Sequence, residues 1–439
     1  MSLAEPKAIA AVAPAEPAAW PWVRAISSIR RPGAHSLLLG GSMVMLAGSV
    51  AVSLFNFAYN VSIARMLGPE GFGHASAAVT LLMLISAITL SFQLVCAKFV
   101  ARNCTVPAQA AVYHLLQRRA WVVGLLLAAG LALGSPLVAG YLKLPTPAIV
   151  ILLAAGIAFY PALGAKRGAL QGTLAFGKLA GNMVLETAAK FVAAVLLVAA
   201  GYGVMGAVGA VTVSIVLAFL IPPPGNLRRS GEVTEPPSFG EGMQAIVFFV
   251  GQVVINNIDI LLVKHFFRAE AAGVYAAVAL AGRVLNFASW SVASAMFPIS
   301  ANGRRASDSP AVLLAPLLLV LAISVVFMLA MGHFPGPIVT LVFGHGFHQA
   351  EPLLELNAAA AGCYALSMVL MAYEMSRRIS STGWYQLAFS GARVAGVYLF
   401  HATLHQVLVV QVVLMTGLLI TVSYVFFRAR PMPMQEAMA

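Results

Sequence analysis

The sequence predicts an all-α polytopic membrane protein with about 12 transmembrane helices in two parallel six-helix lobes. Apolar residues make up 61% of its 439 residues and charged residues only 9%, whereas soluble proteins carry about 25% charged residues. An apolar run of about 18 residues is long enough to cross the hydrocarbon core as a helix. The basic residues also fall almost entirely in every second loop, as in multi-pass membrane proteins.

Apolar runs bounded by polar loops place the individual helices, and two long runs need an internal break. Gly201-Tyr202-Gly203 is expected to end one helix, because glycines favour turns, and the stretch 401–405 is expected to end another. The predicted helices span residues 37–63, 75–97, 120–142, 147–164, 180–200, 204–221, 243–263, 272–298, 311–331, 353–374, 384–400 and 406–427.

Lys and Arg residues counted by side predict the orientation. The two ends of the chain and alternate loops hold 19, and the opposite loops hold four. Both termini are therefore expected in the cytoplasm, with the protein in the bacterial inner membrane. The net charge of +12 then follows from topology and needs no nucleic-acid partner. The expected regions are a tail and basic flank (1–35), an N-lobe (36–221), a linker (222–242), a C-lobe (243–428) and a second tail (429–439).

Two segments 200 residues apart resemble each other. Residues 65–73 end in Glu-Gly-Phe-Gly, and residues 264–273 end in Glu-Ala-Ala-Gly. Each segment follows an odd-numbered helix, so both lie on the same side of the membrane. The repeat is therefore expected to be parallel and to relate helices 1–6 to helices 7–12. Two similar lobes with a site between them are typical of transporters and not of ordinary enzymes.

These segments also carry a family resemblance, which covers about residues 36–427. The run Ile63-Ala-Arg-Met-Leu-Gly-Pro-Glu-Gly-Phe-Gly73 resembles the first loop of the Wzx-type polysaccharide-export flippases of the multidrug/oligosaccharidyl-lipid/polysaccharide exporter (MOP) superfamily. Further resemblance lies in Asn257-Ile-Asp259-Ile-Leu-Leu, Ala272-Gly-Val-Tyr275-Ala, Pro337–Gly344 and Phe347–Ala350.

The resemblance implies a MATE/flippase-like fold and a function. Such proteins move a polyprenyl-diphosphate-linked oligosaccharide from the cytoplasmic to the periplasmic leaflet by alternating access. The product serves O-antigen, capsule or exopolysaccharide biosynthesis. Membrane lipid, and polysaccharide polymerase and export proteins, are the implied partners.

Charged residues within the predicted helices are the first site candidates, because a charge in hydrocarbon is costly. Glu186 and Lys190 lie four residues apart and either pair with each other or line a cavity. Asp259 is expected to pair with Arg283, although Asp259 and Glu186 are also candidates for ion coupling. Arg283 and Lys190 are in turn substrate-binding candidates. Arg393 has no acidic residue near it in sequence, so its guanidinium is the strongest candidate for binding phosphate oxygens. Its alternative is snorkelling toward the cytoplasmic end of its helix.

Amide side chains within the helices are a second set of candidates. Asn56 and Asn60 share one face of the first helix, and Asn257 lies beside Asp259. Such amides either hydrogen-bond the hydroxyl groups of a sugar or hold helices together. Both interpretations stay open for all three.

Several other functions are disfavoured. No GxxxxGK[ST] motif is present, so no nucleotide or other cofactor is expected. The histidine pairs 345/348 and 401/405 lack acidic or cysteine companions, so no metal site is expected. A membrane glycosyltransferase or polymerase would need acidic groups in a large external loop, and the loop 331–352 has only Glu351. A cation-coupled multidrug exporter of the same superfamily remains the main alternative.

Overall fold

The structure is a computed structural model of the chain, and it describes residues 32–103, 105–222, 239–301, 311–377 and 382–428. The two predicted tails and most of the predicted linker 222–242 lie outside the described residues. Every regular element in the described ranges is a helix, which confirms the predicted fold class.

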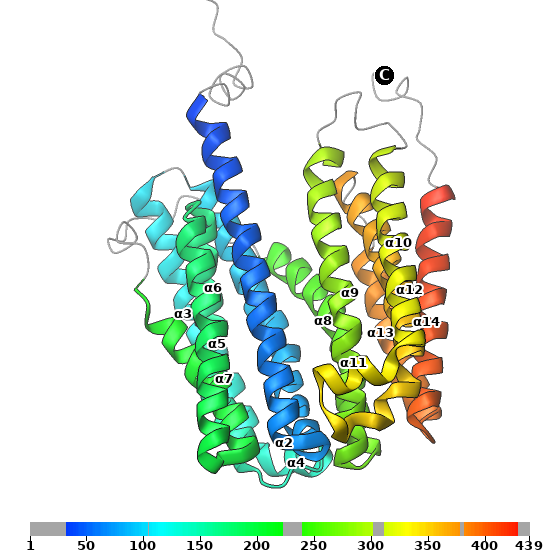
Figure 1. The fold of residues 1–439 in the computed structure, drawn as a ribbon. Coiled ribbons are helices and arrows are strands. Elements are labelled where there is room, and N and C mark those ends of the chain that lie inside the picture. Colours follow the sequence, from blue (N-terminus) through cyan, green and yellow to red (C-terminus); the bar gives the residue numbers. More distant parts are fainter. Residues whose placement is uncertain (1–31, 104, 223–238, 302–310, 378–381, 429–439) are drawn as a thin grey trace, which may run out of the picture.

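Two helical lobes stand side by side (Figure 1). The N-lobe consists of α2 (Pro32–Arg102), α3 (Val106–Leu133), α4 (Ser135–Tyr141), α5 (Ala148–Gly172), α6 (Phe176–Leu197), η1 (Val198–Tyr202) and α7 (Gly203–Leu220). The C-lobe consists of α8 (Phe239–Phe266), α9 (Ala269–Ala301), α10 (Ala311–His333), α11 (Pro335–Val342), η4 (His345–Ala350), α12 (Glu351–Arg377), α13 (Thr382–Leu399) and α14 (Leu404–Arg428).

Nine helical stretches among the described residues are long and apolar enough to cross a membrane. Two of these stretches, Met43–Arg102 and Phe176–Leu220, each contain two helices joined by a kink. Together with α13, this accounts for the twelve predicted membrane helices. The lobes meet where α2 packs against α8 and α9.

The first two membrane helices form one run, α2, that is kinked at Gly68. Gly68 has φ 67° and ψ −177°, a conformation that residues with side chains strongly disfavour. Pro69 follows and suits the first turn of the second helix, because its missing N–H group is not needed there. The predicted loop between helices 1 and 2 is thus reduced to a kink.

The end of the molecule opposite the start of α2 and the end of α14 joins the lobes (Figure 1), and we call it the junction end. There α2 and α9 touch through their backbones. An ideal Cβ atom on Gly73 would overlap the carbonyl oxygen of Ala269, and one on Gly273 would overlap that of Pro69. The two contacts are related by an offset of 200 residues on both sides. This symmetry confirms the predicted parallel repeat.

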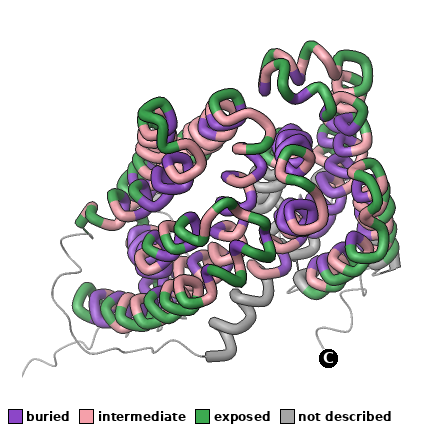
Figure 2. The backbone as a smooth tube through the Cα atoms, turned by 90° about the horizontal axis from the view of Figure 1, so that it is seen from below, coloured by how far each residue is buried: buried purple, intermediate pink, exposed green. Residues whose placement is uncertain are grey.

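The outer helices present apolar side chains to the surroundings. Figure 2 shows the molecule from the junction end, with exposed residues mainly along the outer faces of the helices. Leu126 of α3 and Val326 of α10 are each 67% exposed. Broad exposed apolar surface of this kind suits contact with lipid.

The start of the third membrane helix differs from prediction, whereas two predicted helix breaks are confirmed. The third membrane helix begins at Val106 and not at residue 120, with Thr105 accepting a cap hydrogen bond from the backbone of Ala108. The predicted break at 201–203 is confirmed by the positive φ angles of Gly201 and Gly203. The break near 401–405 is confirmed by the gap between α13 and α14.

Candidate functional site

Arg167 of α5 is the charged centre of the N-lobe. Its guanidinium group forms an ion pair with Glu186 of α6, and its Nε donates to Asn182 Oδ1 at 2.8 Å. Asn182 donates in turn to the carbonyl oxygen of Ala218 on α7 at 2.8 Å. Glu186 is therefore paired across helices with Arg167, and the pair with Lys190, one of the two alternatives for these residues, is not formed.

The reason is that α5 is longer than predicted. Lys166 and Arg167 are predicted as loop residues, but both are buried within α5. The helix continues past Gly168. At this position the missing side chain lets α5 approach the backbone of α2 closely. Lys166 donates to the carbonyl oxygens of Phe219 and Ile221 at the end of α7. These two cations therefore belong to helix packing within the N-lobe.

Lys190 of α6 faces α2 and has no carboxylate within 4.0 Å among the described residues. Its ammonium group donates to Asn56 Oδ1 and lies 4.9 Å from the centre of the Tyr59 ring. Asn60 lies one helical turn further along α2 and donates to the carbonyl oxygen of Asn56 at 2.8 Å. The structure thus brings together three predicted candidates of the N-lobe.

Asp259 of α8 and Arg393 of α13 form a buried ion pair in the C-lobe. Arg393 Nη2 lies 3.1 Å from Asp259 Oδ2, and each side chain is 4% exposed. The guanidinium also donates to the carbonyl oxygen of Ile255. The Tyr275 hydroxyl donates to Asp259 Oδ2 at 2.7 Å and lies 3.0 Å from Gln411 Oε1. Three helices therefore meet at one carboxylate, and α14 joins them through Tyr275.

This pair overturns two predictions. Asp259 does not pair with Arg283, and Arg393 does have an acidic partner. The first prediction assumed that consecutive helices pack as neighbours, and the second considered only acidic residues near Arg393 in sequence. The contact between α13 and α8 arises only from tertiary packing.

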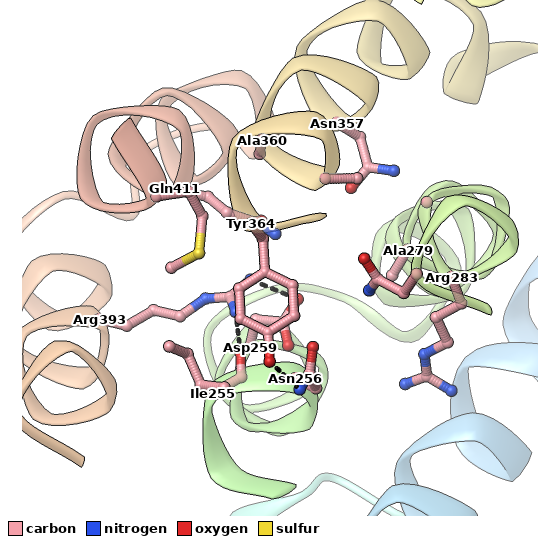
Figure 3. Close-up of a pocket in the computed structure, with 14 residues that line it drawn as sticks. Ile255, Asn256, Asp259, Ala279, Arg283, Asn357, Ala360, Tyr364, Arg393 and Gln411 are labelled. Atoms are coloured by element: carbon pink, nitrogen blue, oxygen red, sulfur yellow. Dashed lines mark hydrogen bonds and ion pairs between the residues drawn. The ribbon is translucent and has the colours of Figure 1, made fainter. Parts of the chain in front are cut away.

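A pocket within the C-lobe lies beside this pair and is lined mainly by polar side chains (Figure 3). Tyr364 of α12 stands in its wall, and its hydroxyl accepts from Asn256 at 2.9 Å and from Gln252 at 3.1 Å. Gln386 of α13 donates to Gln252 Oε1 at 2.7 Å. These bonds tie α8, α12 and α13 together at the pocket wall.

Arg283 of α9 lies in the same pocket wall but points away from Arg393 and toward α2 (Figure 3). Its Nη2 donates to Asn257 Oδ1 at 2.9 Å, and its Nη1 lies 3.9 Å from Met83 Sδ of the N-lobe. No carboxylate of the described residues lies within 4.0 Å of it. An arginine held by an amide and a thioether retains donors and charge for a ligand.

A cavity between the lobes also has Arg283 in its wall. Ser76 contributes from α2, and its buried hydroxyl has no hydrogen-bond partner among the described residues. Asn60 lines the same cavity, so one candidate from each lobe faces it. The full lining is Asn60, Phe72, Ser76, Val79, Thr80, Met83, Ile260, Ala276, Leu280 and Arg283.

The ion pairs decide the electrostatic character of the lobe interface. Glu186 and Asp259, the two carboxylates among the predicted site candidates, are each paired with an arginine. Arg283 and Lys190 are not paired with a carboxylate in the described residues. The balance is therefore positive, and positive charge acts strongly where water is scarce. This arrangement suits an anionic group better than a cationic one.

Sequence reasoning missed Arg167, Tyr275 and Tyr364 as members of these clusters. Arg167 lies in a stretch that the sequence predicts as a basic cytoplasmic loop, so a buried role is not predicted for it. The two tyrosines carry a weak signal, because a polar tip within an apolar helix is usually hydrogen-bonded when buried. Which group bonds them depends on helix neighbours that the sequence does not identify.

Family comparison identifies the class of protein. A family model described as polysaccharide biosynthesis protein matches residues 62–352, about two thirds of the chain. The chain belongs to the polysaccharide biosynthesis protein family. The match confirms the resemblance to polysaccharide-export flippases that the segment 63–73 and the later motifs carry. No curated protein matches the sequence.

Solved structures share the fold of this polysaccharide biosynthesis protein. Lipid II flippase MurJ, in an inward closed conformation, matches with a TM-score of 0.71 at 11% identity, over 90% of this chain and 88% of that chain. An inward-facing multidrug resistance MATE family transporter of the MOP superfamily matches with a TM-score of 0.69 at 14% identity, over 88% of this chain and 96% of that chain. The MATE/flippase-like fold is therefore confirmed.

Proposed function

We propose that this polysaccharide biosynthesis protein translocates a polyprenyl-diphosphate-linked oligosaccharide across the bacterial inner membrane by alternating access. The observation that carries the proposal is Arg283, which lies in the wall of a cavity between the lobes and has no carboxylate partner among the described residues. A diphosphate supplies the oxygens that a guanidinium group binds best. The family match supports a substrate from polysaccharide biosynthesis.

The other candidates have roles that follow from their positions. Lys190 supplies a second positive charge on the N-lobe side, next to Asn56. Asn60 and Asn257 present amides near Arg283, where they contact sugar hydroxyl groups. The polyprenyl tail remains in lipid at the edge of the lobes. Polysaccharide polymerase and export proteins receive the product on the far side.

The charge distribution supports an orientation for transport. Both termini lie in the cytoplasm, and the junction end faces the periplasm, because the loops at the junction end hold few basic residues. Moving negative phosphate outward along an inside-negative potential releases about 2.3 kcal/mol per charge per 100 mV. This gain favours outward transport of the proposed substrate without a nucleotide site.

Arg283→Gln is expected to reduce surface polysaccharide by roughly tenfold or more while the amount of protein in the membrane stays normal. Loss of the guanidinium removes the phosphate contact but strands no buried carboxylate. Arg283→Lys should recover only part of the activity, since a point charge does not reproduce the planar fork. Surface glycan and membrane protein level are measured in a strain that lacks the chromosomal copy.

Arg268→Gln is the matched control, because this exposed arginine lies between α8 and α9 outside the cavity. It should leave glycan output unchanged. Normal output from Arg283→Gln would remove this residue from the substrate site. Loss of the protein itself would assign Arg283 a structural role.

The multidrug exporter alternative makes a different prediction for the same strains. A drug-exporting protein would change resistance to cationic drugs and leave surface glycan intact. The neutralised carboxylates Glu186 and Asp259 favour the oligosaccharide substrate, because a cationic drug needs an unpaired acidic partner.

A further inference from the structure

The repeat at the junction end positions two side chains that the proposed substrate site does not use. Arg65 ends the first membrane helix of the N-lobe, and His265 lies 200 residues later near the end of α8. These two positions are equivalent in the repeat, as Gly73 is to Gly273. Their contacts show the same equivalence.

Arg65 caps a short helix of the other lobe. Its Nε donates to the carbonyl oxygen of Val342 at 2.9 Å, and its Nη2 donates to that of Leu341. Val342 is the last residue of α11. The last carbonyl groups of a helix lack partners within the helix, and a cation there is favourable.

His265 of the C-lobe caps a short helix of the N-lobe. Its Nδ1 lies 2.8 Å from the carbonyl oxygen of Tyr141, the last residue of α4. A carbonyl oxygen only accepts, so Nδ1 carries the proton. The imidazole and the Tyr141 ring also stack, with centroids 3.9 Å apart. Lys264 next to it donates to the carbonyl oxygen of Lys143 at 3.2 Å.

The two capped helices are equivalent as well. α4 follows the third membrane helix of the N-lobe, and α11 follows the third membrane helix of the C-lobe. Both have proline in the first turn. The first helix of each lobe thus caps the short third-helix extension of the other lobe, and the exchange is reciprocal.

We propose that Arg65 and His265 are paired gate residues that hold the junction end closed by this exchange of helix caps. Both caps must break before the cavity at Arg283 opens toward that end. The proposal rests on the proposed alternating-access transport, but it concerns closure and not the substrate. The cap made by Arg65 is the stronger of the two, because Arg65 makes two hydrogen bonds and carries a permanent charge, whereas the His265 side chain makes one hydrogen bond.

Thiol labelling of the cavity tests the gate. Ser76→Cys places a reporter in the cavity wall, in a protein whose Cys96, Cys104 and Cys363 are replaced by serine. A membrane-impermeant maleimide is applied separately to the two faces of sealed vesicles. Without gate substitutions, labelling from the junction face should be slow. Arg65→Ala should raise that rate roughly fivefold.

Further variants separate a gate from a general structural role. His265→Ala should raise labelling from the junction face by less than Arg65→Ala, and the double variant by more than either. Arg268→Ala, which removes an exposed arginine between α8 and α9, should leave the labelling rate unchanged. The exchanged pair, Arg65→His with His265→Arg, should keep labelling slow, since each position still carries a donor.

Unchanged labelling in Arg65→Ala and in the double variant, at normal protein level, would overturn the gate. Equal acceleration by Arg268→Ala would overturn it too, because the effect would then not need a cap. The exchanged pair keeps the proposal testable if the alanine variants fold poorly. Fast labelling in a well-folded exchanged protein also contradicts the proposal. No oligosaccharide is needed, so a different substrate would leave these results intact.

Discussion

Gly273→Ala is expected to reduce surface polysaccharide by roughly tenfold while each lobe still folds. A Cβ atom at this position would overlap the carbonyl oxygen of Pro69, which is backbone and does not rotate away. The lobes must therefore separate at the junction end. Overpacking of this kind costs about 1–3 kcal/mol, which lowers the closed population by roughly tenfold. Surface glycan and membrane protein level are the measurements.

Symmetry supplies one comparison for this prediction, and an open position supplies the control. Gly73→Ala should act like Gly273→Ala, because its Cβ atom would overlap the carbonyl oxygen of Ala269 and lie 2.9 Å from the backbone nitrogen of Gly273. Gly130→Ala should be harmless, since no atom lies within 4 Å of its ideal Cβ position. Normal glycan in both junction variants would show that the close crossing is not needed for transport.

Arg393→Met is expected to lower the amount of protein in the membrane severalfold. Removing one partner of a buried pair costs about 3–5 kcal/mol, because the other charge is left uncompensated. Here the stranded group is Asp259, whose side chain is 4% exposed. The hydroxyl of Tyr275 remains as its donor but does not neutralise it. Protein level in the membrane is measured by immunoblot.

The double variant Arg393→Met with Asp259→Asn decides what the pair does. It removes both charges, so protein level should recover, and transport should stay largely intact if the pair is structural. Recovered protein without transport would instead give Arg393 a direct role at the substrate. No loss of protein in either single variant would contradict a structural role for the pair.

The helices and their arrangement could be predicted because each depends on a local or periodic signal. Apolar runs give the spans, and Gly201 and Gly203 mark a break through positive φ angles. The repeat around Glu70 and Glu270 indicated two parallel lobes. The extent of α5 was missed, because buried Arg167 looks in sequence like a loop cation.

The sequence named some residues of the candidate clusters but not Arg167, Tyr275 or Tyr364, and it did not give the pairings. All of the candidate residues lie within helices, as expected. Glu186 bonds Arg167 and Asp259 bonds Arg393, because helix rotation and neighbours, which sequence spacing does not fix, decide which charges meet. These two ion pairs leave Arg283 and Lys190 as the cations without a carboxylate partner among the described residues. The reciprocal caps at the junction end could not be predicted either, because they join residues that are far apart in the sequence.

Reconstituted transport tests the central claim most directly. The purified protein is placed in liposomes that carry a polyprenyl-diphosphate-linked oligosaccharide in both leaflets, and a glycan-cleaving enzyme is added outside. Transport predicts that nearly all of the lipid-linked glycan becomes cleavable with wild-type protein, and that only the outer half is cleaved with Arg283→Gln. Cleavage that stops at the outer half with well-folded wild-type protein would contradict the proposed function.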